Sequence, residues 1–288
     1  MTATADIDVL VVGHMTVDIV PCGKMLGGTV SYAAPTYAAF GHRVGVLTSA
    51  AYDESLLGHL LHFGKVVSLP ARSSLTYENV YSDRGRQQFV RATACDIRFG
   101  DLPNAWLNAP YVHLGPLAAE LDPLEMARNF PNATVMLTLQ GLMRQWGEDG
   151  LVRFRPWFDA EALRLIDIVV YSQEDIQQYP QLTEKMRAVC KHLIVTNGRN
   201  GGTYYNSGGQ MAYASSDVIP QDLTGAGDVF AASLLGLLPF VENDVRKAIS
   251  IAGRLAAYSV TRSGLDSAPT AEEIADEIAG EVKRVQGG

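Results

Sequence analysis

The chain has 288 residues, of which 47% are hydrophobic and 19% are charged, so it can build a large core and is not intrinsically disordered. Its net charge is −8, with 23 Lys and Arg against 31 Asp and Glu, which excludes a broad basic surface for nucleic acid. The N-terminus lacks a secretory pattern, and the longest apolar run, 229–241, is shorter than the ~20 residues of a membrane span. We therefore expect a cytoplasmic protein with no membrane or nucleic-acid partner.

Short apolar runs rich in β-branched residues alternate with helical patterns along most of the chain. Strands are expected at 7–13, 44–49, 111–114, 134–139, 166–171 and 192–196. Helices are expected at 30–40, 55–63, 123–129, 159–165, 183–189, 226–238, 244–262 and 271–284. This alternation predicts an α/β fold with a doubly wound, mostly parallel sheet and helices on both faces.

Two stretches depart from this alternation. The segment 74–94 has polar and aromatic arms around a turn at 83–86, which is typical of a hairpin that forms a solvated flap. The segment 201–214 indicates a second hairpin with its turn at 207–209. Because the sequence shows no linker and no internal repeat, we expect a single domain over 1–288 with the flap inserted into it.

The segment 222–228, with the sequence DLTGAGD, directly precedes an apolar helix. Glycines allow a sharp turn, and the helix behind it presents unpaired N–H groups and the positive end of its dipole. Gly225, Ala226 and Gly227 could therefore bind a phosphate group. Asp228 in the first helical turn has two interpretations, which are a capping residue and a base that accepts a proton from a hydroxyl.

This segment resembles the second signature motif of the PfkB/ribokinase family of carbohydrate kinases, Asp-Thr-x-Gly-Ala-Gly-Asp, with Leu223 in place of the first threonine. The resemblance implies that Asp228 is the catalytic base and that Gly225, Ala226 and Gly227 form the anion hole. It also implies a ribokinase-like fold with a small β lid, formed by parts of about 14–30 and 66–100.

The first strand and the glycine pair that follows it are similar to the acceptor side of the family's site. The resemblance implies that Asp18, just after the strand, binds substrate hydroxyls, whereas His14 in the same loop has the weaker claim to a role. Gly27 and Gly28 resemble the first signature motif and are implied to contact substrate, the alternative being a simple turn. Tyr32 stands where family members commonly have a substrate-binding asparagine, which leaves the identity of the substrate open.

Two further segments resemble the family's metal sites. The segment 172–175 takes the place of the family's Asn-x-x-Glu motif, which implies that Glu174 and Asp175 hold magnesium through water. The alternative interpretation is an N-cap serine followed by acidic residues in the first helical turn, and both interpretations can hold together. The backbone near Asp222 is implied to contribute, with the segment 259–270, to a site for a monovalent cation such as K⁺.

One more glycine-containing loop resembles the part of the family's site that binds the nucleotide. Thr196, Gly198 and Gly201 follow a predicted strand and resemble the family's Thr-x-Gly-x-x-Gly loop. The resemblance implies that they contact ATP together with Thr224.

The resemblance as a whole implies an ATP-dependent kinase, with Mg²⁺ and K⁺ as further cofactors, for a hydroxyl of a small sugar or sugar alcohol. The segment 138–144, which lacks an aspartate frequent in sugar kinases, resembles the inositol-kinase-like branch. The flap is implied to close over the substrate and to form a homodimer interface. Two alternatives stay open, a nucleoside kinase whose flap aromatics stack a base and a non-catalytic sugar-binding sensor.

Overall fold

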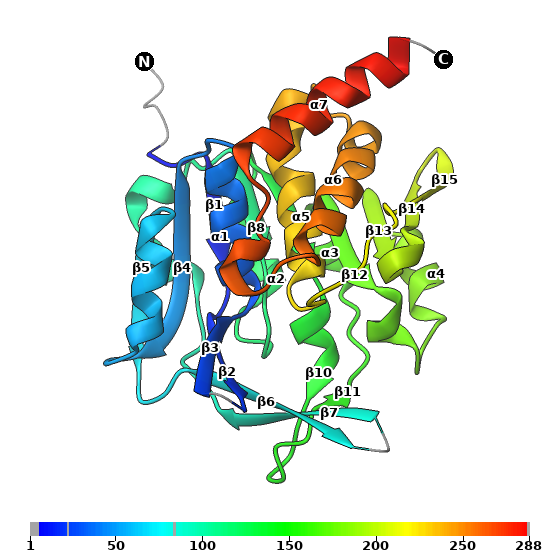
Figure 1. Cartoon of the computed structure of the whole chain (residues 1–288). Coiled ribbons are helices and arrows are strands. Elements are labelled where there is room, and N and C mark those ends of the chain that lie inside the picture. The colour runs from blue at the N-terminus through cyan, green and yellow to red at the C-terminus, as the bar shows by residue number, and fades with distance from the viewer. Residues whose placement is uncertain (1–5, 22, 83–84, 287–288) are drawn as a thin grey trace.

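The computed structural model describes residues 6–21, 23–82 and 85–286 (Figure 1). The strands of its main sheet are β1 (Val9–Val12), β4 (Val44–Ala51), β5 (Lys65–Ala71), β8 (Tyr111–Leu114), β9 (Thr134–Thr138), β12 (Ile168–Ser172), β13 (His192–Thr196), β14 (Gly202–Asn206) and β15 (Gly209–Tyr213). They lie in the order β15-β14-β13-β12-β9-β8-β1-β4-β5. The strands from β13 to β5 in this order are parallel, and β14 and β15 are antiparallel at one edge.

Helices cover both faces of this sheet. They are α1 (Thr29–Ala39), α2 (Pro123–Arg128), α3 (Ala160–Leu165), α4 (Leu182–Arg187), α5 (Ala226–Leu237), α6 (Val245–Ser259) and α7 (Ala271–Gln286). α1, α5 and α6 share one core with the sheet, and α2, α3 and α4 share the other. In β1, Val9 and Val11 belong to the first core and Leu10 and Val12 to the second. Both faces are therefore buried, which explains the continuous apolar runs and confirms the predicted doubly wound fold.

Short polar side chains set several helix starts. Asp122, Asp159 and Asp244 accept hydrogen bonds from backbone N–H groups in the first turns of α2, α3 and α6. Within the described ranges, no helix has both the length and the hydrophobicity that a bilayer crossing would require.

The segment 55–63 and the edge strand β5 differ from the sequence-based expectation. The segment predicted as a helix at 55–63 is a 3₁₀ helix over Ser55–His62, in which only Leu60 is fully buried. One buried side chain and the interior Gly58 give little support to a regular α-helix. β5 was not predicted, because this edge strand is half-exposed and contains Pro70.

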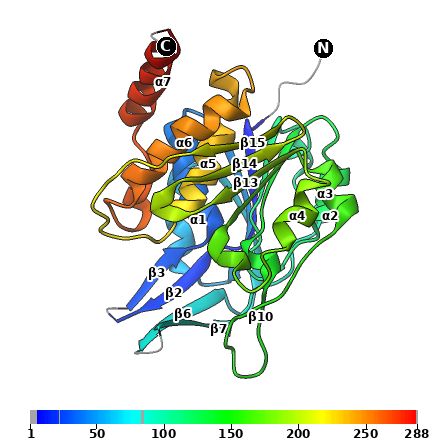
Figure 2. The ribbon, with the colours of Figure 1, turned by 90° about the vertical axis from the view of Figure 1, so that its right-hand side faces the viewer.

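A second, smaller sheet lies at the end of the molecule where the parallel strands terminate (Figures 1 and 2). Its strands are β2 (Thr16–Val20), β3 (Gly23–Gly27), β6 (Leu75–Ser82) and β7 (Gly85–Ala92), in the order β3-β2-β6-β7. We call it the small sheet. The predicted hairpin supplies β6 and β7, and residues 83 and 84 of its expected turn lie outside the described residues. The predicted flap is not wholly solvated, because Leu75, Tyr77 and Val90 form a small core with Leu117.

Candidate active site

Two helices begin side by side between the main sheet and the small sheet. α1 follows Gly28 and α5 follows Gly225, and both glycines have positive φ, 90° and 79°. α1 and α5 pack against each other, and a side chain added at Gly225 would lie 2.5 Å from the ring of Tyr32 in the first turn of α1. Two positive helix ends therefore meet at the carboxyl edge of the main sheet.

The turn before α5 leaves backbone donors unused. The N–H of Ala226 turns back toward the carbonyl oxygen of Leu223 at 3.4 Å. Within the described residues, the N–H groups of Gly227 and Asp228 have no hydrogen-bond acceptor. A methyl group added at Gly227 would meet no atom within 4 Å. The turn therefore combines two free donors with open space beside Gly227, which suits an anion.

Asp228 lies in the first turn of α5, partly open to solvent and otherwise surrounded by protein. Burial raises its pKa to about 6, while a hydrogen bond from Thr29 and the charge of Arg144 lower that pKa. The carboxylates of Asp175 and Asp18 raise it further. A carboxylate with a pKa near 6 is mostly ionised at neutral pH and is a stronger base than an ordinary aspartate.

Asp18 lies on β2 and faces the same space. Its Oδ1 accepts a hydrogen bond of 2.9 Å from the hydroxyl of Thr16. A side chain added at Gly27, on the neighbouring β3, would collide with the carboxylate of Asp18 and with the hydroxyl of Thr16. Only glycine at this position leaves room for the carboxylate.

Tyr32 forms the wall between the two helix starts. It is 3% exposed, and burial raises its pKa well above the usual range, with Asp228, Asp18 and Asp222 contributing in the same direction. Its ring lies against Gly225. Tyr32 therefore supports the turn at Gly225 and also borders the space near Asp18.

Sequence analysis missed Arg144 as a site residue. It follows a 3₁₀ turn over Gln140–Met143, is half-buried, and has its guanidinium carbon 5.8 Å from the ring centre of Tyr77 on β6. Its charge lowers the pKa of both Asp228 and Asp175, yet it forms no ion pair in the parts of the chain that the structure describes. The available signal was an arginine shortly after the carboxyl end of a parallel strand, where ligands bind in α/β sheets.

Among the candidate metal ligands, Asp175 lies close enough to Arg144 for the charge of Arg144 to lower the pKa of Asp175. Asp175 accepts a hydrogen bond of 2.9 Å from the N–H of Ser172, and burial raises its pKa. Glu174 is exposed, and Asp222 accepts the N–H of Thr224 at 2.9 Å. Among residues 6–21, 23–82 and 85–286, no group of three His, Cys, Asp or Glu side chains could hold a metal ion. These residues fit Mg²⁺ only as an ion that keeps waters and phosphate oxygens as most of its ligands.

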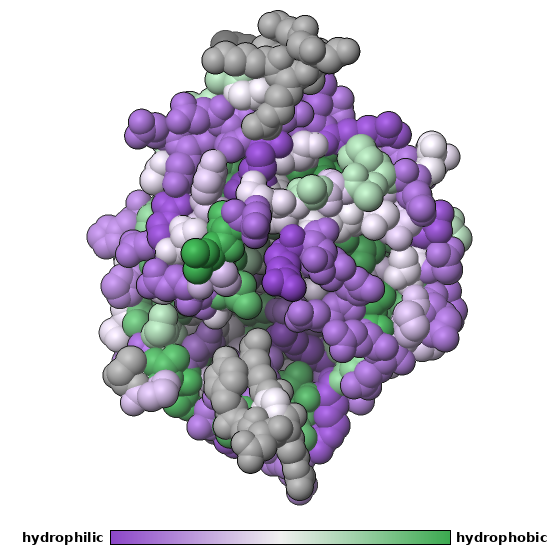
Figure 3. All heavy atoms as spheres, turned by 45° about the vertical axis from the view of Figure 1, so that its right-hand side comes forward, coloured by the Kyte–Doolittle hydropathy of each residue, from purple (hydrophilic) through white to green (hydrophobic). Residues whose placement is uncertain are grey.

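The predicted nucleotide loop follows the neighbouring strand. Thr196 ends β13 directly opposite Ser172 of β12, and Gly198 and Gly201 continue the chain with φ of 51° and 77°. Thr224 is exposed beside the turn before α5. The loop and the candidates Glu174 and Asp175 therefore lie at adjacent strand ends. The surface on this side is hollowed between the main body and the small sheet (Figure 3).

Known proteins resemble the chain in sequence and in fold. A model of the pfkB family of carbohydrate kinases matches residues 159–271. Fructokinase of Escherichia coli is 30% identical over 228 residues, which cover 68% of this chain and 71% of that protein. Fructokinase with bound ATP from Xylella fastidiosa is similar in fold, with a TM-score of 0.75, 18% identity, and coverage of 96% of this chain and 99% of that one.

A second solved structure carries a different phosphate donor. It is a pyrophosphate-dependent kinase in the ribokinase family, complexed with a pyrophosphate analog and myo-inositol. Its TM-score to this chain is 0.74 at 20% identity, with coverage of 93% of this chain and 99% of that one.

Proposed function

The chain belongs to the PfkB family of carbohydrate kinases, and we propose that it transfers the terminal phosphoryl group of ATP to a hydroxyl of a small sugar or sugar alcohol. One observation carries this proposal. The ionisable Asp228 and the free N–H groups of Gly227 and Asp228 occupy the same helix start. A base and an anion site so close together suit an attack of a hydroxyl on a phosphoryl group.

On the acceptor side, Asp18 and the backbone of Gly27 and Gly28 would hold hydroxyl groups of the substrate. Asp228 would take the proton of the attacking hydroxyl as the oxygen–phosphorus bond forms. Its raised pKa suits this role, because a base is most effective when its pKa lies near the working pH. The hydrogen bond from Thr29 keeps the carboxylate oriented toward the space between the two helix starts.

On the donor side, the N–H groups at Gly227 and Asp228 would stabilise the negative charge that spreads over the transferred phosphoryl group. Arg144 would supply the positive charge on the opposite side, since its charge already acts on Asp228 without being neutralised by an ion pair among the described residues. When bound, Mg²⁺ neutralises donor phosphates, and Glu174 and Asp175 would hold it through water. The segment that contains Asp222 would contribute to binding of K⁺.

We also propose that the small sheet acts as a lid over the acceptor and as the interface of a homodimer. Two exposed apolar side chains on it, Met25 and Val80, support a role in contacts with another surface. A lid would exclude water, which otherwise competes with the acceptor for the phosphoryl group.

ATP is favoured as the donor over pyrophosphate by the chain that leads into the anion-binding turn. Ile219 is 92% exposed and Leu223 is 71% exposed. A purine base would cover such apolar surface, whereas pyrophosphate has no group that could do so. Thr196, Gly198, Gly201 and Thr224 are the proposed nucleotide contacts. Pyrophosphate stays as the second candidate donor because of the solved kinase with the pyrophosphate analog.

A matrix of donors and acceptors tests this proposal. Purified protein is incubated with ATP or pyrophosphate, together with fructose, ribose, myo-inositol or a nucleoside, and the phosphomonoester product is quantified. We expect ATP to support phosphorylation of at least one sugar or inositol. Product from pyrophosphate alone would overturn the choice of donor, and product from nucleosides alone would overturn the class of acceptor.

Gly227→Ala separates folding from phosphate binding. Because the added methyl group would meet no protein atom within 4 Å and Gly227 lies inside α5, we expect the free energy of unfolding to stay unchanged or to rise by about 0.5–1 kcal/mol. The methyl group would stand in the open space beside the free N–H groups and crowd a bound phosphate, so kcat/KM for the donor should fall about 10- to 100-fold. Thermal unfolding and steady-state kinetics measure the two effects.

Gly58→Ala is the matched control, since a side chain there also meets no atom within 4 Å and Gly58 lies far along the chain from the turn. Its kcat/KM should equal that of the wild type. If Gly227→Ala retained the wild-type kcat/KM for the donor, the anion hole would not lie at this turn.

A further inference from the structure

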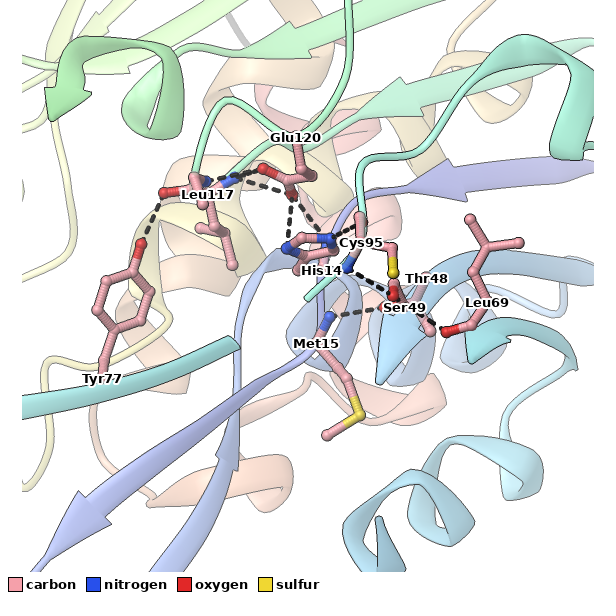
Figure 4. Close-up of polar contacts among 10 residues, drawn as sticks. His14, Met15, Thr48, Ser49, Leu69, Tyr77, Cys95, Leu117 and Glu120 are labelled. Atoms are coloured by element: carbon pink, nitrogen blue, oxygen red, sulfur yellow. Dashed lines mark hydrogen bonds and ion pairs between the residues drawn. The ribbon is translucent and has the colours of Figure 1, made fainter. Parts of the chain in front are cut away.

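A buried carboxylate that the proposed chemistry does not use lies beyond the end of β8. Glu120 is 3% exposed. Its two oxygens accept hydrogen bonds from the N–H groups of Leu117, at 3.1 and 2.9 Å, and of Ala118, at 2.7 Å (Figure 4). Ala119 between them has φ of 56°, a conformation that a non-glycine residue adopts when its surroundings impose it. The side chain of Glu120 thus closes a tight turn over its own backbone, which we call the 117–120 turn.

The same carboxylate reaches across to the loop between β1 and β2. The N–H of His14 donates to Oε1 of Glu120 at 2.8 Å (Figure 4). His14, which sequence analysis gave the weaker claim to a role, is 1% exposed, and its Nε2 lies 2.8 Å from the carbonyl oxygen of Cys95, just beyond β7. Because a carbonyl oxygen can only accept, Nε2 is the donor of this hydrogen bond. His14 therefore joins Glu120 to both the start of β2 and the chain that leaves β7.

The 117–120 turn holds the small sheet from a second direction. The hydroxyl of Tyr77, on β6, donates to the carbonyl oxygen of Leu117 at 2.7 Å, and Tyr77 is 3% exposed (Figure 4). Glu120 fixes that carbonyl by binding the N–H groups of the same turn. Three points of the small sheet, the entry to β2, the middle of β6 and the exit from β7, are thereby linked to one carboxylate.

The two segments held by Glu120 also border the acceptor side of the candidate active site. A side chain added at Gly28 would lie 2.7 Å from the carbonyl oxygen of His14 and 2.9 Å from Cδ1 of Leu117. Gly28 precedes Thr29, which binds Asp228. Asp18 lies on β2, which begins at Thr16, shortly after His14. A shift of either segment would move the groups proposed to hold the acceptor, whereas the free N–H groups of Gly227 and Asp228 lie on α5.

We propose that Glu120 is a positioning residue for acceptor binding. Its carboxylate fixes the distance between Asp18, the start of α1 and the small sheet, so that the acceptor meets an assembled site. This inference rests on the proposed function, because it assumes that the acceptor binds between Asp18 and Asp228.

Glu120→Gln tests the inference. The amide group replaces one acceptor oxygen by an N–H₂ group that faces backbone donors, so the joint between the loop and the turn should loosen. We expect KM for the acceptor that the wild type uses to rise about tenfold, with KM for the donor unchanged. Glu125→Gln is the matched control, because this half-buried carboxylate on α2 has no hydrogen bond or ion pair within the described ranges. A purely structural role would lower the amount of folded enzyme and leave both KM values alone.

Tyr77→Phe breaks the same connection from the small sheet, and it keeps the inference testable if Glu120→Gln does not fold. We expect Tyr77→Phe to raise the acceptor KM less than Glu120→Gln does. In the double variant, the fold-increase in acceptor KM should be less than the product of the two single fold-increases, since both substitutions act through the 117–120 turn. An unchanged acceptor KM in a folded Glu120→Gln variant would overturn the inference. If Glu120→Gln does not fold, an unchanged acceptor KM in Tyr77→Phe would overturn it. Independent effects of the two substitutions in the double variant would overturn it as well. An inactive wild-type protein would instead overturn the proposed function.

Discussion

Asp228→Asn is expected to lower kcat about 10²- to 10⁴-fold, because it removes the group that accepts the proton of the attacking hydroxyl. Asparagine has nearly the same shape and can still accept the hydrogen bond from Thr29. The affinity for ATP should therefore change little. Initial rates with the wild type's own acceptor, together with ATP binding measured by calorimetry, separate the two effects.

The same substitution should make the protein more stable. The pKa of Asp228 is about 6 in the folded protein against an ordinary value of 3.8, so its ionised form opposes folding, and this cost grows as the pH rises from about 4 to above 6. Allowing for the part of the side chain that solvent reaches, we expect Asp228→Asn to gain about 1–2 kcal/mol in free energy of unfolding at neutral pH. Below about pH 4 this gain in stability should vanish, since Asp228 is then protonated and neutral, as asparagine is.

Asp217→Asn is the control for both effects, because Asp217 is an exposed carboxylate in the segment before the same turn. It should change neither kcat nor stability. An Asp228→Asn variant with a near-normal kcat would show that another group accepts the proton.

Arg144→Met is expected to lower kcat about 10²- to 10³-fold while the fold remains intact. Methionine keeps the unbranched apolar part of the side chain beside Tyr77 but removes the charge that acts on Asp228 and Asp175. Since that charge would stabilise the transferred phosphoryl group, the loss should appear in kcat more than in the KM of the acceptor. Steady-state kinetics with saturating donor and varied acceptor measure this difference.

Arg153→Met provides the matched control. Arg153 lies on β11 (Arg153–Phe154), which pairs with β10 (Arg144–Gln145), and it forms an exposed ion pair with Asp149. Its loss should leave kcat unchanged, whereas Arg144→Lys should recover only part of the activity because lysine lacks the planar fork of arginine. If Arg144→Met and Arg153→Met behaved alike, the charge of Arg144 would have no part in the reaction.

The main sheet could be predicted because each of its central strands is buried on both faces and therefore appears as a continuous apolar run. β2, β3 and β5 could not, since their burial comes from only one side or from neighbours that are distant in sequence. β3 begins with the exposed residues Gly23, Lys24 and Met25, which resemble a loop. The 3₁₀ helix at Ser55–His62 was predicted as a regular helix from its apolar pattern, although it contains Gly58 and buries only Leu60 fully.

For the site, the structure places Asp18, Asp222 and Asp228 around Tyr32, and each of these carboxylates raises the pKa of Tyr32. Their functional roles remain proposals. The glycine turn at Gly225 could be recognised in the sequence because the groups proposed to bind phosphate belong to one continuous stretch of backbone. Contributions that depend on folding, such as the charge of Arg144 and the hydrogen bonds of Glu120, have no local sequence signal beyond their position after a strand.

The pH dependence of kcat/KM tests most directly whether Asp228 acts as the base. The base must be ionised, so with a pKa of about 6 the plot of log kcat/KM should rise with unit slope at low pH and level off above about pH 6. In Arg144→Met this limb should shift to higher pH, because the positive charge that favours the carboxylate is lost. A kcat/KM that stays constant between about pH 5 and 7, or a shift to lower pH in Arg144→Met, would contradict the account.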